Sequence, residues 1–146
     1  MTSRAGHNDL VQHEITGQII GSFFAVYNEL GFGFLESVYR RSMYYELIER
    51  GMNVDEEAPI DVRYRKWKVG HFRSDLYVEH KVIVEIKSSE KLALGDRKQL
   101  ANYLKATGIE VGLLLHFGRR ATYERVVQTK RVADSQYNHQ RSSPSA

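Results

Sequence analysis

Residues 75–87 read DLYVEHKVIVEIK, and this stretch decides the fold because it holds two strands and the connection between them. Successive side chains of a strand point to opposite faces of a sheet. In the second strand, residues 82–87, one face is therefore apolar and the other carries Glu85 and Lys87. The first strand alternates in the same way and places Asp75 on its polar face.

The apolar residues also predict how these two strands pair. Those that would share the buried face are Leu76, Val78, Val82 and Val84. This pairing puts Asp75 beside Glu85, whereas a slip of one residue would send Asp75 to the opposite face. The connection over residues 79–81 is therefore predicted to contain an odd number of residues and not to be a two-residue turn.

Upstream of this stretch, apolar residues spaced three or four apart predict an N-terminal helical hairpin. The first helix is expected from His7 to about Leu30 and the second from about Phe34 to Arg50, with residues 31–33 between them. The apolar stripe of the first helix consists of Leu10, Val11, Ile15, Ile19, Ile20, Phe23, Phe24 and Tyr27.

Short segments rich in Val, Ile and Tyr predict a sheet. The expected strands cover residues 58–65, 69–78, 82–87, 111–117 and 124–129. A helix is expected from Gly95 to about Thr107, with Asp96 as its N-cap and Gly108 as its stop. This order predicts an α/β domain with a mixed central β-sheet flanked by helices, in which a right-handed crossover joins the third and fourth strands in parallel.

The composition narrows the class of protein. The chain has 146 residues, is 42% hydrophobic, carries a net charge of +3 and contains no cysteine. This length predicts one domain over residues 1–132, followed by a polar, disordered tail over residues 133–146. Disulfides and thiolate chemistry are excluded, so a metal would be held by oxygen or imidazole. No apolar run is long enough to cross a bilayer, and we expect a soluble, cytoplasmic protein without a membrane partner.

Asp75, Glu85 and Lys87 are the residue types that metal-assisted phosphodiester cleavage requires. Mg²⁺ and Mn²⁺ prefer oxygen ligands, so the two carboxylates and the backbone carbonyl of Ile86 are candidate metal ligands. A lysine nearby can orient the attacking water or neutralise developing charge. The alternative is an ordinary charged strand face, because Glu-x-Lys is a common tripeptide and a second one occurs at residues 79–81.

Two predicted helices carry side chains that could complete such a site. Glu36 and Tyr39 are three apart on the second helix, and Gln99 and Tyr103 are four apart on the third, so each pair shares a helix face. Amide and hydroxyl groups can contact phosphate oxygens or ligand waters. The structural alternative is that the acid favours the helix dipole and that both tyrosines pack in the core.

Taken in order, these segments resemble the GxxExxY proteins of the PD-(D/E)XK nuclease superfamily. Residues 33–39, GFLESVY, match the signature, and the resemblance extends over about residues 14–127. It includes ELGFG at 29–33, RSDL at 73–76, VEIK at 84–87, QLANYLKATG at 99–108 and GLLLHFG at 112–118. The resemblance implies a restriction-endonuclease-like core, with Asp75 and Glu85 as the two metal-binding acids and Lys87 as the lysine of the motif.

The resemblance also implies roles for the helical residues. Gln99 and Tyr103 are similar to the Gln-x-x-x-Tyr element of an exonuclease-like branch, and Glu36 is similar to its helical acid, which contributes to the metal site. The function implied is that of a Mg²⁺- or Mn²⁺-dependent nuclease acting on DNA or RNA. The alternative is a non-catalytic binding or regulatory subunit of a nucleic-acid-processing assembly, in which dimerisation through the helical hairpin would compensate for the small size of the chain.

A basic, aromatic segment admits two further interpretations. Its members are Arg63, Tyr64, Arg65, Lys66, Trp67, Lys68, Phe72 and Arg73. Such residues could contact phosphates and stack on bases. The interpretation favoured by the sequence is an exposed hairpin whose long cationic side chains accompany a small apolar cluster.

Overall fold

A computed structural model of the chain describes residues 5–128, with side chains from residue 12 onward. The elements in chain order are α1 (Ala5–Leu30), α2 (Glu36–Glu49), β1 (Val54–Tyr64), β2 (Trp67–Val78), β3 (Val82–Lys87), α3 (Leu94–Thr107), β4 (Val111–Phe117) and β5 (Ala121–Val127). The strands form one sheet in the order β1-β2-β3-β4-β5. β3 and β4 run parallel and the other neighbours run antiparallel, which confirms the predicted mixed sheet.

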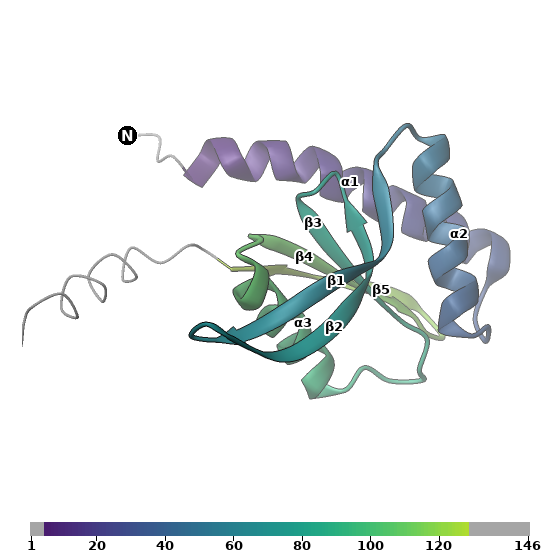
Figure 1. The fold of residues 1–146 in the computed structure, drawn as a ribbon. Coiled ribbons are helices and arrows are strands. Elements are labelled where there is room, and N and C mark those ends of the chain that lie inside the picture. The colour runs from purple at the N-terminus through teal and green to yellow at the C-terminus, as the bar shows by residue number, and fades with distance from the viewer. Residues whose placement is uncertain (1–4, 129–146) are drawn as a thin grey trace, which may run out of the picture.

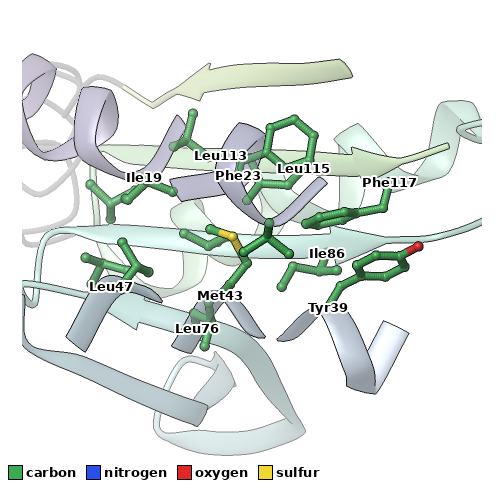
Figure 2. Packing of buried hydrophobic residues seen from close by; sticks show 14 of the residues in the cluster. Ile19, Phe23, Tyr39, Met43, Leu47, Leu76, Ile86, Leu113, Leu115 and Phe117 are labelled. Carbon is green, nitrogen blue, oxygen red and sulfur yellow. The ribbon is translucent and has the colours of Figure 1, made fainter. Parts of the chain in front are cut away.

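Helices cover both faces of this sheet (Figure 1). On one face, α1 and α2 pack together against the strands, and the rings of Phe23 and Tyr39 contact Phe117 at centroid distances of 4.7 and 4.1 Å (Figure 2). On the other face, α3 packs through Leu100 and Leu104. The predicted helical hairpin and third helix are therefore present and enclose two separate cores.

The central strand β3 contributes to both cores because its side chains alternate. Val82, Val84 and Ile86 are buried in the core formed with α1 and α2. Ile83 is buried in the core formed with α3. Glu85 has the same parity as Ile83 and therefore also faces α3.

Close packing of α3 depends on Gly112 of β4, which has no side chain. A Cβ atom at this position would lie 2.8 Å from Cδ1 of Leu100. At the other end of α3, Gly108 adopts a φ of +75° and its N–H donates to the carbonyl of Leu104 at 2.9 Å. Gly108 therefore ends the helix as predicted, in the left-handed conformation that glycine adopts without strain.

Some boundaries differ from the predicted ones. β1 begins at Val54 and not near residue 58, because Glu56 in its acidic first half pairs with Arg41 of α2. The sequence of this segment has low strand propensity, and the ion pair across elements is a tertiary effect. β5 begins earlier than predicted, at Ala121, because the pairing of Ala121 with Phe117 leaves a short connection after β4.

The predicted end of the last strand at residue 129 and the predicted tail over residues 133–146 lie outside the described residues. Of the helices in the described part of the chain, none combines the length and apolar character needed to cross a bilayer.

The β1–β2 hairpin extends beyond the rest of the sheet. β2 pairs with β3 only from Leu76 to Val78, whereas its pairing with β1 continues outward to Trp67. We call residues 58–74 the arm. The regular pairing is interrupted at its base, where Glu57 has a φ of +51° and the ladder passes from Glu56 to Ala58.

The arm bends toward α3. Ile60 is buried with α3 residues, and the ring of Phe72 lies 5.6 Å from that of Tyr103. Leu76 and Val78 have the same parity as Phe72 along β2, yet they are buried on the opposite side with α1 and α2. The simple alternation expected of a strand therefore fails between Phe72 and Leu76, next to Asp75.

Candidate active site

The β2–β3 connection has the odd length that the sequence predicted. Val78 pairs with Val82, which leaves residues 79–81 between the strands. Glu79 and His80 both have positive φ, and the N–H of Lys81 donates to the Val78 carbonyl at 3.0 Å. The connection thus contains Lys81 in addition to the two turn residues Glu79 and His80. This third residue keeps β2 and β3 in the predicted register.

That register brings Asp75 and Glu85 together. The backbone N–H of Asp75 donates to Oε1 of Glu85 at 3.3 Å, and the N–H of Ile86 donates to Oδ2 of Asp75 at 2.7 Å. Each carboxylate is therefore held by the backbone of the opposite strand. Glu85 is only 6% exposed, whereas Asp75 is partly exposed.

The environment of Glu85 disfavours its ionised form. Burial, and then the negative charge of Asp75, raise the pKa of Glu85 to about 8, although Lys87 acts in the opposite direction. Glu85 therefore favours its protonated form at neutral pH. A bound cation would favour ionisation of both groups, so the chemistry of this donor set fits a hard divalent metal ion.

Lys87 lies at the end of β3 and is directed by a residue that the sequence did not assign to the site. Its Nζ atom is 3.9 Å from Oδ1 of Asp96, and both side chains are largely buried. The prediction of Asp96 as the N-cap of α3 is wrong, because the N-cap position is Ala93. Oδ2 of Asp96 accepts the N–H of Ala93 at 2.9 Å from the third position of the helix. An acid three residues after an N-cap is the available sequence signal for this arrangement.

His116 supports the segment that follows Lys87. It is the β4 partner of Lys87 and is buried, with its ring Nε2 atom 2.6 Å from the carbonyl oxygen of Ser89. Gly118 leaves room for this ring, since a Cβ there would lie 2.6 Å from it. His116 is therefore a structural residue of β4.

Tyr103 of α3 faces the acidic pair. Its side chain is buried, and burial together with the charges of Glu85 and Asp75 raises the pKa of the Tyr103 hydroxyl. Gln99, one turn earlier, is exposed and lines a hollow of about 790 Å³ together with Tyr103. Tyr103 thus lies near the pair, and Gln99 is an exposed residue of the adjoining hollow.

Glu36 stands apart from the acidic pair. It is the first residue of α2 and is exposed. Tyr39, one turn later, lies at the same end of the core as Phe117 and Ile86 (Figure 2). Within residues 12–128, no group of three or more acidic or histidine side chains is arranged to hold a metal ion. Within the described residues, the structure therefore does not group Glu36 with the pair as a third ligand.

Comparison with known proteins identifies the family. The family model of the PD-(D/E)XK nuclease superfamily matches residues 13–132. A search of curated proteins finds no match.

Solved structures add a similarity of fold. The crystal structure of SSO0001 is similar with a TM-score of 0.53 and 18% identity, covering 76% of this chain and 61% of that chain. An alkaline exonuclease (LHK-Exo) from Laribacter hongkongensis has a TM-score of 0.48 and 17% identity, covering 70% of this chain and 58% of that chain. The chain thus spans less than two thirds of the length of either structure. With the family model matching most of its residues, the chain belongs to the PD-(D/E)XK nuclease superfamily.

Proposed function

We propose that this protein is a nuclease of the GxxExxY branch that hydrolyses phosphodiester bonds of DNA or RNA with Mg²⁺ or Mn²⁺. The observation that carries the proposal is the Asp75–Glu85 pair, which two backbone N–H groups hold together next to Lys87. Two acids placed in contact, one of them buried, oppose folding. Such an arrangement is typical of functional sites.

The metal would be held by Asp75, Glu85 and the backbone carbonyl of Ile86. Glu36 of α2, which the resemblance implies as a further ligand, does not form a group with them in the described part of the chain. When bound, the metal would polarise the phosphate and lower the pKa of a water molecule. These ligands are all oxygen atoms, as Mg²⁺ and Mn²⁺ prefer.

The remaining roles belong to side chains around the pair. Lys87, directed by Asp96, orients the attacking water or neutralises charge that develops on the phosphate. The raised pKa of Tyr103 keeps its hydroxyl protonated, so that it can donate a hydrogen bond to a phosphate oxygen. The exposed amide of Gln99 can donate in the same way from the adjoining hollow.

A second function belongs to a different class and is favoured by one observation. Glu36 does not form a metal-binding group with the acidic pair in the described part of the chain. Under this alternative the protein is a binding or regulatory subunit of a nucleic-acid-processing assembly. Exposed apolar residues around the start of α2 would then support a homodimer; they are Phe32, Phe34, Leu35 and Val38. A cytoplasmic location suits either function, because a cysteine-free chain is compatible with a reducing compartment.

A cleavage assay tests the first function against the second. Highly purified full-length protein is incubated with single- and double-stranded DNA and RNA, with Mg²⁺ or Mn²⁺ and with a chelator. We expect metal-dependent cleavage that falls by roughly 100-fold or more in Asp75→Asn and in Lys87→Ala. Lys81→Ala, which removes a lysine at the opposite end of β3, serves as the matched control and should cleave like the wild type. Absence of cleavage on all four substrates, or equal cleavage by Asp75→Asn, would exclude the nuclease function.

A further inference from the structure

We infer that the arm is a binding element for a single strand of nucleic acid, which stacks its bases on aromatic side chains at the tip and passes through the hollow beside α3. This inference names the substrate class of the proposed active site and therefore builds on the proposed function. It concerns binding, however, and can be tested without cleavage.

The tip of the arm combines exposed rings with unneutralised positive charge. Tyr64 and Trp67 pair across the end of the hairpin and are 59% and 53% exposed. Arg65 and Lys66 form the turn between them and lie over the two rings, 5.3 and 5.0 Å from their centroids. Among the described residues, neither cation has a carboxylate within ion-pair distance. Base faces and phosphates are the complementary groups, since bases stack on such rings and phosphates pair with such cations.

Packing within the fold does not explain the aromatic residues at the tip of the arm. A hairpin that protrudes from a sheet gains little stability from its own pairing, and exposed tryptophan and tyrosine rings there are not buried against a core. Further down the arm, Ile60 and Phe72 already provide the packing against α3. The aromatic residues at the tip are thus not required to hold the arm in place.

The hollow lies between the arm and α3, and Tyr103 belongs both to its lining and to the surroundings of the acidic pair. Phe72, which is 44% exposed, forms one wall, and α3 forms the other. Lys98, Asn102 and Lys105 of α3 line it, together with Arg63 of the arm. The one acid in the lining, Asp61, is occupied by Lys68 at 3.3 Å and His71 at 2.7 Å.

The dimensions and the lining favour an unpaired strand over a duplex. The hollow has a volume of about 790 Å³, within the range of about 300–1,000 Å³ of small-molecule sites and therefore suited to nucleotide-sized groups. Its amide and cationic groups can contact base edges and phosphates, and the Phe72 ring offers a stacking surface. Bases in a duplex are already stacked on one another and cannot use these rings. Tyr103 lines the hollow and its hydroxyl also feels the charges of Glu85 and Asp75, so a strand bound here would lie next to the acidic pair.

The chain contains a direct probe for this binding. Trp67 is its single tryptophan, so intrinsic tryptophan fluorescence reports on the tip of the arm alone. The full chain in a chelator is titrated with an unlabelled oligothymidylate of about 12 nucleotides, a length within the usual single-strand site size. An oligouridylate and a duplex of the same length are titrated in parallel, and a labelled strand gives the affinity by anisotropy.

We expect the single strands to quench Trp67 fluorescence and to bind at least 10-fold more tightly than the duplex. Trp67→Ala should weaken single-strand binding by roughly 5- to 100-fold, as loss of one stacking partner does. Arg65→Ala and Lys66→Ala together should reduce the slope of log affinity against log salt by roughly 1.4, about 0.7 for each phosphate contact. Lys98→Glu should weaken binding, whereas Lys81→Glu makes the same charge change at the far end of β3 and should have little effect. Thermal unfolding of each variant checks that its fold is intact.

The possible results separate this inference from the proposed function. Binding of DNA alone, RNA alone or both supports the inference and identifies the strand. Unchanged Trp67 fluorescence with unchanged affinity of Trp67→Ala, or a duplex that binds as tightly as the single strands, would overturn it. If Trp67→Ala loses binding but the wild type never cleaves, the arm inference stands and the nuclease proposal fails. If the wild type cleaves but Trp67→Ala binds single strands as tightly as the wild type, the nuclease proposal stands and the arm inference fails.

Discussion

Glu85 is buried and lies beside Asp75. Burial and the neighbouring charge together make the stability of the folded protein depend on pH. The pKa of Glu85 rises from its ordinary value of 4.5 to about 8 on folding. Between these values the folded chain binds more protons than the unfolded chain, so its stability falls as the pH rises. The contribution of protonated Glu85 to the unfolding free energy is fully present below the unfolded-state pKa of 4.5. It is lost as the pH rises through the folded-state pKa of about 8.

We therefore predict that Glu85→Gln stabilises the metal-free protein at alkaline pH. A glutamine is neutral, as protonated Glu85 is, and can still accept the N–H of Asp75. The gain in unfolding free energy should be on the order of 2 kcal/mol near about pH 9 and close to zero near about pH 4. Urea unfolding of the wild type and of Glu85→Gln, in a chelator and at several pH values, measures this gain. A gain that does not increase with pH would contradict the assigned cause, while the nuclease proposal requires that the same variant lose cleavage.

Asp96 is predicted to have two separable functions. Its carboxylate accepts the Ala93 N–H at the start of α3 and also lies beside Lys87. Asp96→Ala removes both interactions and should lower the unfolding free energy by about 1 kcal/mol, as loss of a capping interaction does. Asp96→Asn retains an acceptor oxygen, so most of this stability should remain.

Cleavage distinguishes the second function of Asp96 from the first. Both variants lack the charge that directs Lys87, and each should lower the cleavage rate by at least about 10-fold, because precise placement of a catalytic group contributes strongly to rate. Denaturant unfolding and single-turnover cleavage are measured on the same preparations. If Asp96→Asn cleaves like the wild type, Asp96 is only a capping residue.

At the scale of elements, the contact between α3 and β4 depends on the absence of one side chain. Leu100 is fully buried and cannot move away from a Cβ atom at position 112. We predict that Gly112→Ala lowers the unfolding free energy by roughly 1–3 kcal/mol, as overpacking of a core does. Because α3 carries Tyr103, it should also impair the proposed site.

Gly17 provides the matched control for this substitution. It is exposed within α1, and a Cβ there would meet no atom within 4 Å. Gly17→Ala should therefore raise the unfolding free energy by roughly 0.5–1 kcal/mol, because alanine restricts the unfolded chain more than glycine does. Chemical denaturation of both variants gives the comparison, and equal effects of the two substitutions would refute the packing argument.

Some features of the strands could be predicted from the sequence and others could not. The pairing of Asp75 with Glu85 was predictable because alternating apolar residues in β2 and β3 specify one register. The early start of β1 was not predictable, because its acidic residues are stabilised by arginines of α2 that only the fold brings near. The bend between Phe72 and Leu76 was likewise not predictable, since it coincides with the interruption at Glu57, whose positive φ no local motif requires.

The same distinction applies to the candidate site. Strand alternation located Asp75, Glu85 and Lys87, and helical spacing located Tyr103. The role of Asp96 as a neighbour of Lys87 could not be predicted, because it depends on how the loop between β3 and α3 closes. Whether Glu36 groups with the pair is decided by tertiary packing, so the motif alone could not define it.

At the scale of the whole molecule, metal binding should couple to stability. A cation that binds the folded chain and not the unfolded one adds roughly 2.7 kcal/mol at about 100 times its Kd. We predict that saturating Mg²⁺ or Mn²⁺ raises the Tm of the wild type by several degrees and that a chelator reverses the rise. Differential scanning fluorimetry measures both changes.

Asp75→Asn serves as the control for this coupling, because it removes one proposed ligand without changing the shape of the side chain. Its Tm should not respond to the metal over the same concentration range. An equal rise in the wild type and in Asp75→Asn would show that the ion binds elsewhere.

The double burial of β3 has a consequence for any attempt to map this protein by mutation. The strand that carries Glu85 and Lys87 also supplies side chains to both cores. In a saturation library scored by cleavage, nearly every position of β3 would be intolerant, because loss of folding and loss of activity would occur together. Folding and activity would be affected separately only by substitutions that keep the shape of the side chain and remove its charge. For this strand, a library must therefore be scored for protein abundance as well as for cleavage before any position in it can be assigned to catalysis.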